Sequence, residues 1–410
     1  MMKSALTILF ASALVLSCSN NSDSSKAPIQ EANNTAVTWR GVLQMNDSTE
    51  LPFNFVVEDD LVTITNGEEK VIIDSIVEVG DTTELYLPVF QTVFKVHRDT
   101  KTWNGYWQKL DADDYRMPFT ASKGVEYRFN NVVWKSEISL PAKWEVTLRS
   151  GTDNEKPAIG EFHVKPNGAA TGTFLTETGD YRFLQGMFDG RNLKLSGFDG
   201  THAYFFDAVY DGQQLSGTHY SGKTYAQPWT AIPNDDFELR DPTQLTFIKD
   251  GYEGISFSLP TVNGEDFTFD GKSTNGPTII QIMGSWCPNC MDETRYFKQL
   301  HEKYAERGLT IIGITYEYKP ELEEAKPAIQ KMIRDLDIPY TIVYGGLANP
   351  ESIATTLPMI ENFMSYPTSI FIDSEGNVRR IHTGFSGPGT SEFEPYSVET
   401  EALIEEMLGE

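Results

Sequence analysis

The chain has 410 residues, of which 40% are hydrophobic, 22% charged and 12% aromatic. This length is large for one hydrophobic core and indicates two or three domains. Asp and Glu number 59 against 33 Lys and Arg, a net charge of -26, which argues against nucleic acid as a partner because phosphates require a basic surface.

The first residues predict an export signal that is not part of the fold. Residues 5–16 are apolar, a run too short to span a bilayer permanently. Residues 15–18 (Val-Leu-Ser-Cys) resemble the lipobox of bacterial lipoproteins. The resemblance implies a signal peptide at residues 1–17 and a lipid on Cys18. A plain secretory signal cleaved near Ser17 is the alternative.

Residues 18–36 are mostly polar and predict a flexible tether behind the lipid anchor. Such an anchor would place the protein in the cell envelope, facing the periplasm, with the outer membrane favoured over the inner one. The chain has three cysteines, so lipidation of Cys18 leaves Cys287 and Cys290. An exported chain with this pair alone does not rely on structural disulfides, and we expect the pair to serve chemistry.

Residues 37–240 predict an all-β half. Short alternating runs such as residues 53–57 and 61–65 are separated by Asn-Gly and Asp-Gly pairs, which supply the positive φ angles of tight hairpins. The aromatic residues of this half either fill two small cores, which is the favoured interpretation, or line a binding pocket; they include Trp103, Tyr106, Trp107, Tyr204, Phe205 and Phe206.

This half also shows signs of duplication. Trp39 and Trp144 open similar segments, and similar closing segments, Pro-Phe-Thr-Ala and Pro-Trp-Thr-Ala, follow each of them. The repeat predicts two related modules, residues 37–131 and 132–240. We expect each module to be a meander that closes into a barrel or sandwich, because closure hides the edges of a sheet.

Residues 241–410 have a different pattern, in which strands and helices alternate. This alternation is typical of a central sheet covered by helices. The predicted strands are residues 267–269, 277–283, 309–316, 341–344, 368–372 and 378–382, the last two forming a hairpin. The predicted helices are residues 287–307, 321–337 (bent or split at Pro327), 351–357 and 399–408.

Trp286-Cys287-Pro288-Asn289-Cys290 lies where a buried strand meets a helix. The spacing of the cysteines puts both sulfurs on one face of the first helical turn. The positive end of the helix dipole favours a thiolate there, so we expect Cys287 to be an exposed nucleophile with a lowered pKa. Cys290 would then resolve the mixed disulfide. Pro288 costs no hydrogen bond in a first turn.

Together with Glu293 and with Tyr366-Pro367-Thr368 before a strand, this motif resembles the thioredoxin fold. More closely, it is similar to the TlpA/ResA-type thiol:disulfide oxidoreductases of bacterial envelopes. The resemblance covers residues 256–410 and leaves the β modules outside. It implies an α/β thioredoxin fold and a thiol:disulfide oxidoreductase whose catalytic residues are Cys287, Cys290 and Glu293.

The resemblance gives Glu293 a role in proton exchange with the sulfurs or in tuning their pKa values. The alternative is a helix-surface carboxylate stabilised by the helix N-terminus. Gln281 stands where thioredoxin has a buried Asp, and a neutral amide cannot shuttle protons, so more weight falls on Glu293. Residues 256–259 and Trp286 are expected to shield the sulfurs.

Pro367 resembles the cis-proline that faces the dithiol in thioredoxin folds, where the neighbouring backbone binds the substrate peptide. The residues expected to bind substrate are therefore Trp286, Pro288, Tyr366 and Pro367.

The predicted function is reduction of disulfides in exported proteins, with a membrane thiol carrier as electron donor and with no cofactor. An oxidising or isomerising role would require only a higher reduction potential. A zinc site lacks a second set of ligands, since His301 and His382 are isolated. A peroxiredoxin shares the fold, but Gly284 stands where those enzymes carry Thr. A non-enzymatic ligand-binding lipoprotein is the remaining alternative.

Overall fold

The computed structural model describes residues 36–59, 61–112, 114–129 and 139–409. The predicted signal peptide, Cys18 and the tether up to residue 35 lie outside these ranges. Ala36–Glu410 form one unit by their internal contacts. Within the described ranges, none of the helices combines the length and the apolar character that crossing a membrane requires.

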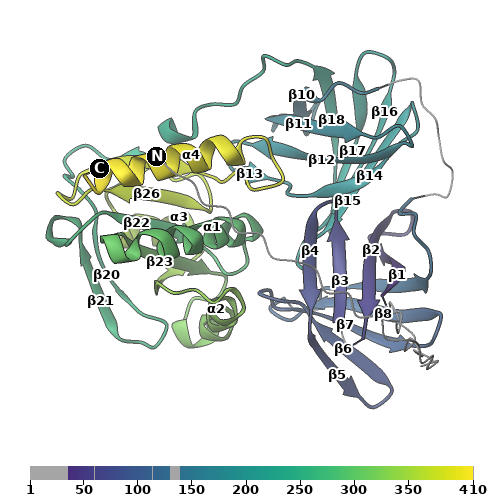
Figure 1. Ribbon diagram of the computed structural model, residues 1–410, viewed down its shortest axis with the longest axis horizontal. Coiled ribbons are helices and arrows are strands. Elements are labelled where there is room, and N and C mark those ends of the chain that lie inside the picture. Colours follow the sequence, from purple (N-terminus) through teal and green to yellow (C-terminus); the bar gives the residue numbers. More distant parts are fainter. Residues whose placement is uncertain (1–35, 60, 113, 130–138, 410) are drawn as a thin grey trace, which may run out of the picture. The chain divides into compact units, whose positions relative to one another are not determined.

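The first sheet has nine antiparallel strands in the order β4-β3-β2-β1-β9-β8-β7-β6-β5 (Figure 1). Along β9, exposed and buried residues alternate, so one face of the strand packs on the core and the other meets solvent. The strands are β1 (Val37–Gln44), β2 (Glu50–Glu58), β3 (Leu61–Asn66), β4 (Glu69–Ile73), β5 (Ser75–Val79), β6 (Thr82–Tyr86), β7 (Thr92–Arg98), β8 (Thr102–Lys109) and β9 (Arg116–Lys123).

The second sheet runs β11-β10-β18-β17-β16-β15-β14-β12-β13, and β11 also pairs with β12. This additional pairing closes the sheet into a barrel, which leaves the short β13 outside the ring. The strands are β10 (Lys143–Leu148), β11 (Lys156–Val164), β12 (Ala169–Thr176), β13 (Gly179–Asp180), β14 (Leu184–Phe188), β15 (Asn192–Phe198), β16 (Ala203–Tyr210), β17 (Leu215–Ser221) and β18 (Tyr225–Pro233).

The two sheets pair their first and last strands in the same way. Leu43 of β1 lies opposite Phe119 of β9, and Leu148 of β10 lies opposite Trp229 of β18. The similar opening and closing segments of the sequence are thus the strands that meet. The strands fall within the ranges 37–131 and 132–240, whose exact boundaries stay predictions.

The aromatic residues of the β half mainly fill its cores. Trp103 and Trp107 are buried in the first sheet, and Phe206 is buried in the second. Phe198 and Phe205 come from the second sheet but pack in the core of the first, so the two modules share apolar contacts. The core interpretation is confirmed for these residues.

The C-terminal region contains a five-stranded sheet in the order β24-β23-β22-β26-β27, in which β22, β23 and β24 are parallel and β26 and β27 antiparallel. This order, with helices between the strands, is a thioredoxin-like fold. Its elements are β22 (Thr278–Met283), α1 (Pro288–Tyr304), β23 (Thr310–Glu317), α2 (Leu322–Leu336), β24 (Thr341–Leu347), α3 (Pro350–Thr356), β26 (Thr368–Ile372), β27 (Val378–Thr383) and α4 (Phe393–Met407).

Short elements precede and flank this sheet. Two small two-stranded sheets pair β19 (Phe247–Ile248) with β25 (Ile360–Glu361), and β20 (Ser256–Pro260) with β21 (Asp266–Asp270). Three 3-10 turns complete the region: η1 (Pro242–Gln244), η2 (Gly271–Ser273) and η3 (Ala305–Arg307). All residues of β22 are buried, which fits its unbroken apolar sequence.

Two helices differ from the prediction. Helix α2 continues through Pro327 and is not split; Pro327 is exposed, so water can satisfy the carbonyl that its missing N–H leaves free. Helix α4 begins at Phe393 and not at Glu399, because Pro395 falls in its first turn, where a proline removes no intrahelical hydrogen bond.

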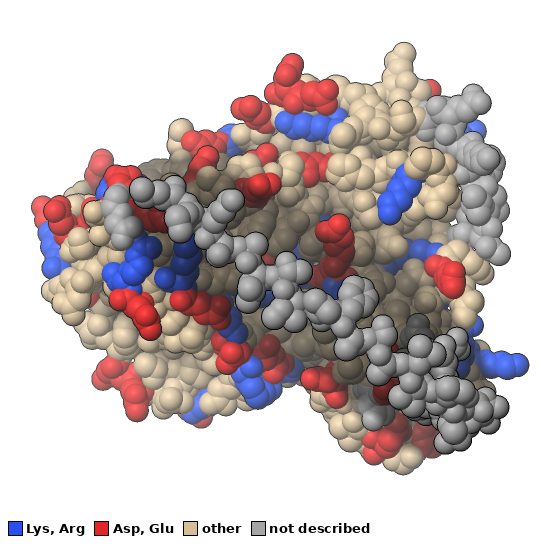
Figure 2. All heavy atoms as spheres, in the orientation of Figure 1, with Lys and Arg blue, Asp and Glu red and all other residues tan. Residues whose placement is uncertain are grey.

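On the face of the molecule that Figure 2 shows, acidic and basic side chains are intermixed. Figure 2 shows Asp and Glu side chains across the visible face, with Lys and Arg interspersed among them. The excess of acidic residues that gives the net charge of -26 is therefore not gathered in one patch on this face.

Candidate active site

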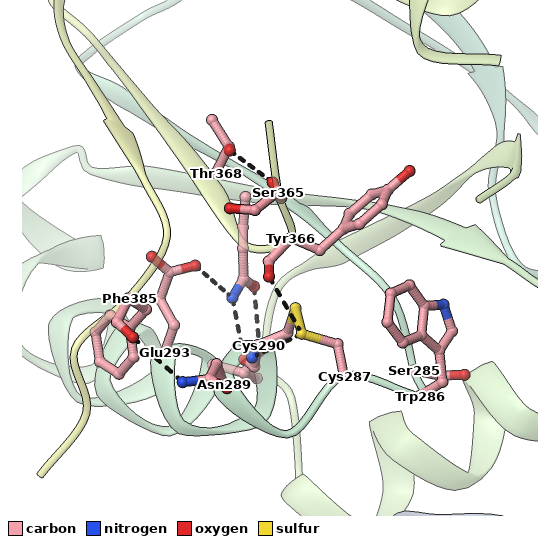
Figure 3. The surroundings of a disulfide bond; sticks show 12 residues. Ser285, Trp286, Cys287, Asn289, Cys290, Glu293, Ser365, Tyr366, Thr368 and Phe385 are labelled. Atoms are coloured by element: carbon pink, nitrogen blue, oxygen red, sulfur yellow. Dashed lines mark hydrogen bonds between the residues drawn. A yellow bond between two sulfur atoms is a disulfide. The ribbon is translucent and has the colours of Figure 1, made fainter. Parts of the chain in front are cut away.

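The cysteine pair sits at the start of α1, immediately after β22. Cys287 is the N-cap residue of the helix, and its Sγ accepts a hydrogen bond from the backbone N–H of Cys290 at 3.2 Å. The two cysteines form a disulfide, with their Cα atoms 5.2 Å apart (Figure 3). The helix N-terminus therefore offers its free N–H groups to the sulfur of Cys287, which favours a thiolate in the reduced form.

The disulfide is more deeply buried than the sequence predicts. Cys287 is 4% exposed and Cys290 0% exposed, so the expectation of an exposed Cys287 is wrong for this oxidised form. The expected shield is wrong for residues 256–259, whose apolar side chains pack in a different cluster, whereas Trp286 packs against the cluster of the cysteines. The cluster that holds both cysteines contains Val89 and Phe90 of the first β module.

Glu293 lies one helical turn after Cys290 and is fully buried. Its carboxyl group accepts hydrogen bonds from Ser369 Oγ at 2.6 Å and from Gln281 Nε2 at 2.9 Å. Burial raises the pKa of Glu293 to about 8, although these hydrogen bonds and Arg380 act in the opposite direction. The alternative of a helix-surface carboxylate is therefore wrong. A carboxyl with this pKa can both hold and release a proton near neutral pH.

The Tyr366–Pro367 peptide lies beside the disulfide. The Tyr366–Pro367 peptide bond is cis, as the sequence predicts. The carbonyl oxygen of Tyr366 lies 3.6 Å from the Sγ of Cys287. Figure 3 shows this carbonyl directed at the disulfide, with Trp286 and Glu293 on opposite sides of it. The backbone beside Pro367 is thus placed where an extended peptide could reach the sulfur.

Aromatic side chains line the Trp286 side of the site. The indole N–H of Trp286 donates to the carbonyl of Tyr316 at 3.0 Å, which fixes the ring. Tyr318 stacks on this ring at a centroid distance of 4.6 Å, and Tyr366 meets it edge-on at 5.5 Å. Tyr318 is 59% exposed, so this aromatic surface opens to solvent.

The two residues between the cysteines have different surroundings. Pro288 is the first residue of α1 and is buried. Asn289 is half-buried, and its side-chain amide donates to the carbonyl of Phe385 at 3.3 Å. This hydrogen bond ties the cysteine motif to the segment that follows β27.

Sequence reasoning missed a second buried carboxylate, Glu317, at the end of β23. It accepts hydrogen bonds from the backbone N–H of Ser285 at 2.9 Å and from its hydroxyl at 2.6 Å, and Thr315 also donates to it. Burial raises the pKa of Glu317. An acidic residue in an otherwise apolar strand was the available signal, and its contacts hold the residues just before Trp286 in place.

The sheet order, the cysteine pair at a helix start and the cis-proline opposite it define the C-terminal region as a thioredoxin-like thiol-disulfide oxidoreductase domain. Residues 249–396 match the family model of the Redoxin domain. The β modules lie outside this match. Among the described residues, no group of His, Cys, Asp and Glu is arranged to hold a metal ion.

Several curated proteins are similar to this region. The thioredoxin-like protein YneN of Bacillus subtilis is 25% identical over 33% of this chain and 73% of its own length. The thiol-disulfide oxidoreductase ResA of Halalkalibacterium halodurans is 25% identical over 33% of this chain and 68% of its own. The thiol:disulfide interchange protein DsbE of Pasteurella multocida is 31% identical over 26% of this chain and 51% of its own.

Solved structures cover the same part of the chain. A thioredoxin-family thiol:disulfide interchange protein from Chlorobium tepidum is 26% identical, with a TM-score of 0.30, and covers 38% of this chain and 96% of its own. A thiol-disulfide oxidoreductase from Bacteroides fragilis is 17% identical, with a TM-score of 0.28, and covers 37% of this chain and 99% of its own.

Proposed function

We propose that this protein reduces disulfide bonds of exported proteins through Cys287 and Cys290. The observation that carries the proposal is the placement of a disulfide-linked Cys-Pro-Asn-Cys motif at a helix N-terminus, opposite a cis-proline and one turn before a buried carboxyl group. The proposed roles are Cys287 as nucleophile, Cys290 as resolving thiol and Glu293 as proton carrier. Trp286, Pro288, Tyr366 and Pro367 would form the substrate-binding surface.

The reaction begins with the reduced dithiol. The thiolate of Cys287 attacks one sulfur of the substrate disulfide, and the departing substrate sulfur takes up a proton. Cys290 loses its proton to Glu293 and attacks the Cys287 sulfur of the mixed disulfide. The substrate leaves as a dithiol with two electrons and two protons gained, and the protein ends in the disulfide form.

The buried Glu293 suits this second step. Cys290 is 0% exposed, so its proton cannot pass directly to bulk water. Glu293 is fully buried one turn further along the same helix, and a pKa of about 8 lets it accept a proton and return it at neutral pH. A carboxyl with an ordinary pKa of 4.5 would be a weaker acceptor for a thiol proton.

We also propose where the protein is located and what supplies its electrons. Cys18 would carry a lipid that anchors the chain in the cell envelope, facing the periplasm, with the outer membrane favoured over the inner one. A membrane thiol carrier would return two electrons to the Cys287–Cys290 disulfide after each cycle. The names of the similar proteins ResA and DsbE, a thiol-disulfide oxidoreductase and a thiol:disulfide interchange protein, support this class of reaction.

The reduction potential of the Cys287–Cys290 pair tests the proposed direction of electron flow. Equilibration with glutathione or dithiothreitol buffers, followed by alkylation of free thiols, gives the potential directly. A reductase should lie near thioredoxin, at about -270 mV. A value near the oxidant DsbA, at about -120 mV, would contradict the proposal and favour an oxidising role.

A further inference from the structure

The loop between β6 and β7 of the first module is fastened to helix α2 of the C-terminal domain. We name residues 87–91 the screening segment. Lys331 Nζ donates to the carbonyl of Leu87 at 2.9 Å, and the backbone N–H of Val89 donates to Asp335 Oδ2 at 2.9 Å. Lys331 and Asp335 also pair with each other at 2.5 Å. Two hydrogen bonds thus hold this segment against the thioredoxin-like domain, and the ion pair within α2 orients the two side chains that form them.

Val89 adopts a backbone conformation that is costly for its residue type. Its φ angle is 65°, in the left-handed region, which a β-branched residue rarely enters because its side chain is strained there. Val89 is 3% exposed and Phe90 7% exposed, and both pack in the apolar cluster that contains Cys287 and Cys290. The burial of these two apolar side chains offsets the strain in the Val89 backbone. The strained conformation thus places Val89 and Phe90 in the apolar cluster of the cysteines.

The same two side chains stand between two cavities beside the cysteine motif. A cavity of about 190 Å³ is lined by Val89 and Phe90 together with Trp286 and Tyr318. A larger cavity of about 1220 Å³ is lined by Val89 and Phe90 together with Met291. Trp286 and Met291 flank the cysteine motif in the sequence, so the screening segment lines a cavity next to each end of the motif.

The second β module also packs against the thioredoxin-like domain. The Cβ of any residue replacing Gly384 would come within 2.9 Å of the carbonyl carbon of Thr178, so the two backbones are in direct contact. Asp180 accepts a hydrogen bond from the backbone N–H of Gly387. The segment after β27, to which Asn289 is bonded, is therefore packed against the second module.

With loops of both β modules packed beside the motif, little of the disulfide is open to solvent, since Cys287 is 4% exposed and Cys290 is 0% exposed. Tyr318 is exposed beside the cysteine motif. It stacks on Trp286 and lines the smaller cavity. An extended polypeptide can pass along these rings toward the Sγ of Cys287 and the backbone of Tyr366. A folded protein, whose disulfide sits on a broad surface, would collide with the two β modules before its sulfur reached Cys287.

We propose that the screening segment, through Val89 and Phe90, determines the substrate class: disulfides on extended, unfolded polypeptide react, and disulfides on folded proteins are excluded. This inference rests on the proposed reductase function and names its substrates more narrowly. The covalent step is the exchange described above, in which the two cysteines supply two electrons to the substrate disulfide, one proton comes from Cys290 by way of Glu293 and the second proton comes from water.

The test compares one disulfide in two settings. The first probe is a short peptide closed by a single disulfide, and the second is the same loop grafted onto the surface of a folded carrier protein. Full-length protein is reduced with dithiothreitol, freed of reductant and mixed with each probe. The wild-type protein should reduce the peptide much faster than the grafted loop.

Phe90→Ala should raise kcat/KM for the grafted loop about tenfold while changing that for the peptide less than about twofold. Val79→Ala is the matched control, because Val79 is exposed in the same sheet and lines neither cavity; it should change neither rate. Lys331→Gln removes the charged donor to the Leu87 carbonyl and leaves the apolar residues of the segment unchanged. It should also raise kcat/KM for the grafted loop, and it replaces Phe90→Ala if that variant fails to fold.

The outcomes separate the two proposals. Equal rates of the wild-type protein on both probes, or equal acceleration of both by Phe90→Ala, would overturn the screening role and leave the reductase intact. Failure of the wild-type protein to reduce even the free peptide would overturn the reductase proposal and this inference with it.

Discussion

The side-chain amide of Gln281 donates a hydrogen bond to the carboxyl group of Glu293 at 2.9 Å, from the centre of β22 to the first turns of α1. The same amide nitrogen lies 3.3 Å from the carbonyl oxygen of Cys290, to which it also donates. The strand residue therefore links the buried carboxyl to the turn that carries the resolving cysteine. In the proposed reaction, Gln281 therefore orients the proton carrier Glu293, and its neutral amide does not carry protons itself.

Glu293→Gln should slow the reaction without breaking the fold. The substitution keeps the shape and one acceptor oxygen but removes the titratable group, so we expect kcat at pH 7 to fall about a hundredfold. Stopped-flow reduction of a peptide disulfide over pH 6–9 measures this, and the pH dependence attributed to Glu293 should disappear. Glu302→Gln, which neutralises an exposed carboxylate on the same helix, is the control for a change of charge alone; an equal loss in both variants would contradict the proton-carrier role.

Glu293 should also make the folded protein less stable as the pH rises. Its ordinary pKa is 4.5, and burial raises the pKa in the folded state to about 8, so between these values the folded state binds more protons than the unfolded state. The stabilising contribution is complete below about pH 4.5 and is lost as the pH rises through about 8. At pH 9, Glu293→Gln should therefore be more stable than the wild type by about 1–3 kcal/mol in urea unfolding. If Glu293→Gln is no more stable than the wild type at pH 9, burial does not destabilise the ionised carboxylate of Glu293.

The roles of the two cysteines can be separated by trapping. Cys290→Ala leaves the attacking thiolate and removes the resolving one, so it should accumulate a mixed disulfide with a substrate peptide. Cys287→Ala should accumulate none, because Cys290 is fully buried. Non-reducing mass spectrometry detects the adduct, and its appearance with Cys287→Ala in place of Cys290→Ala would reverse the assigned order.

The sequence predicts those parts of the site that depend on neighbouring residues. The unbroken apolar run of β22 predicts a buried strand, and the cysteine spacing predicts two sulfurs on one helical turn; both are found. The cis form of Pro367 follows from the resemblance to the thioredoxin fold, because no local pattern distinguishes this X-Pro bond from the others in the chain.

The parts that depend on distant residues could not be predicted. Val89 is 246 positions from Asp335, to which it donates a hydrogen bond, and Arg182 is 110 positions from Asp292. Hydrophobic periodicity reports on one element at a time, so it cannot show which loop of a β module covers a helix of another domain. The apolar cluster that holds Cys287 likewise includes Val89 and Phe90, almost 200 positions away in the sequence.

The proposed lipid anchor makes a prediction for Cys18, which lies outside the described residues. Cys18→Ser should abolish incorporation of a labelled fatty acid and move the protein from the membrane fraction to the soluble fraction of the cell. The isolated soluble form should keep its peptide-reducing activity, because Cys287 and Cys290 are unaffected. Unchanged membrane association would contradict lipidation, and release after cleavage near Ser17 would support the plain secretory signal.

The guanidinium group of Arg182 joins all three folded parts of the chain. It pairs with Glu69 of the first sheet at 2.6 Å, with Asp199 of the second at 3.4 Å and with Asp292 of α1 at 2.7 Å, and these side chains are all at most 10% exposed. Burial raises the pKa of Glu69, which shows that its charge is poorly solvated, and Arg182 counteracts that shift.

Removing this cation should therefore be far more costly than removing a similar one at the surface. Arg182→Met leaves three carboxylates buried with their central cation gone, and we expect a loss of about 3–5 kcal/mol in the free energy of unfolding. Arg240 forms an equally short pair with Glu177, at 2.6 Å, but is 60% exposed, so Arg240→Met should cost less than about 1 kcal/mol. Urea unfolding of both variants at pH 7 measures the difference, and equal losses would show that Arg182 does not hold the three parts together.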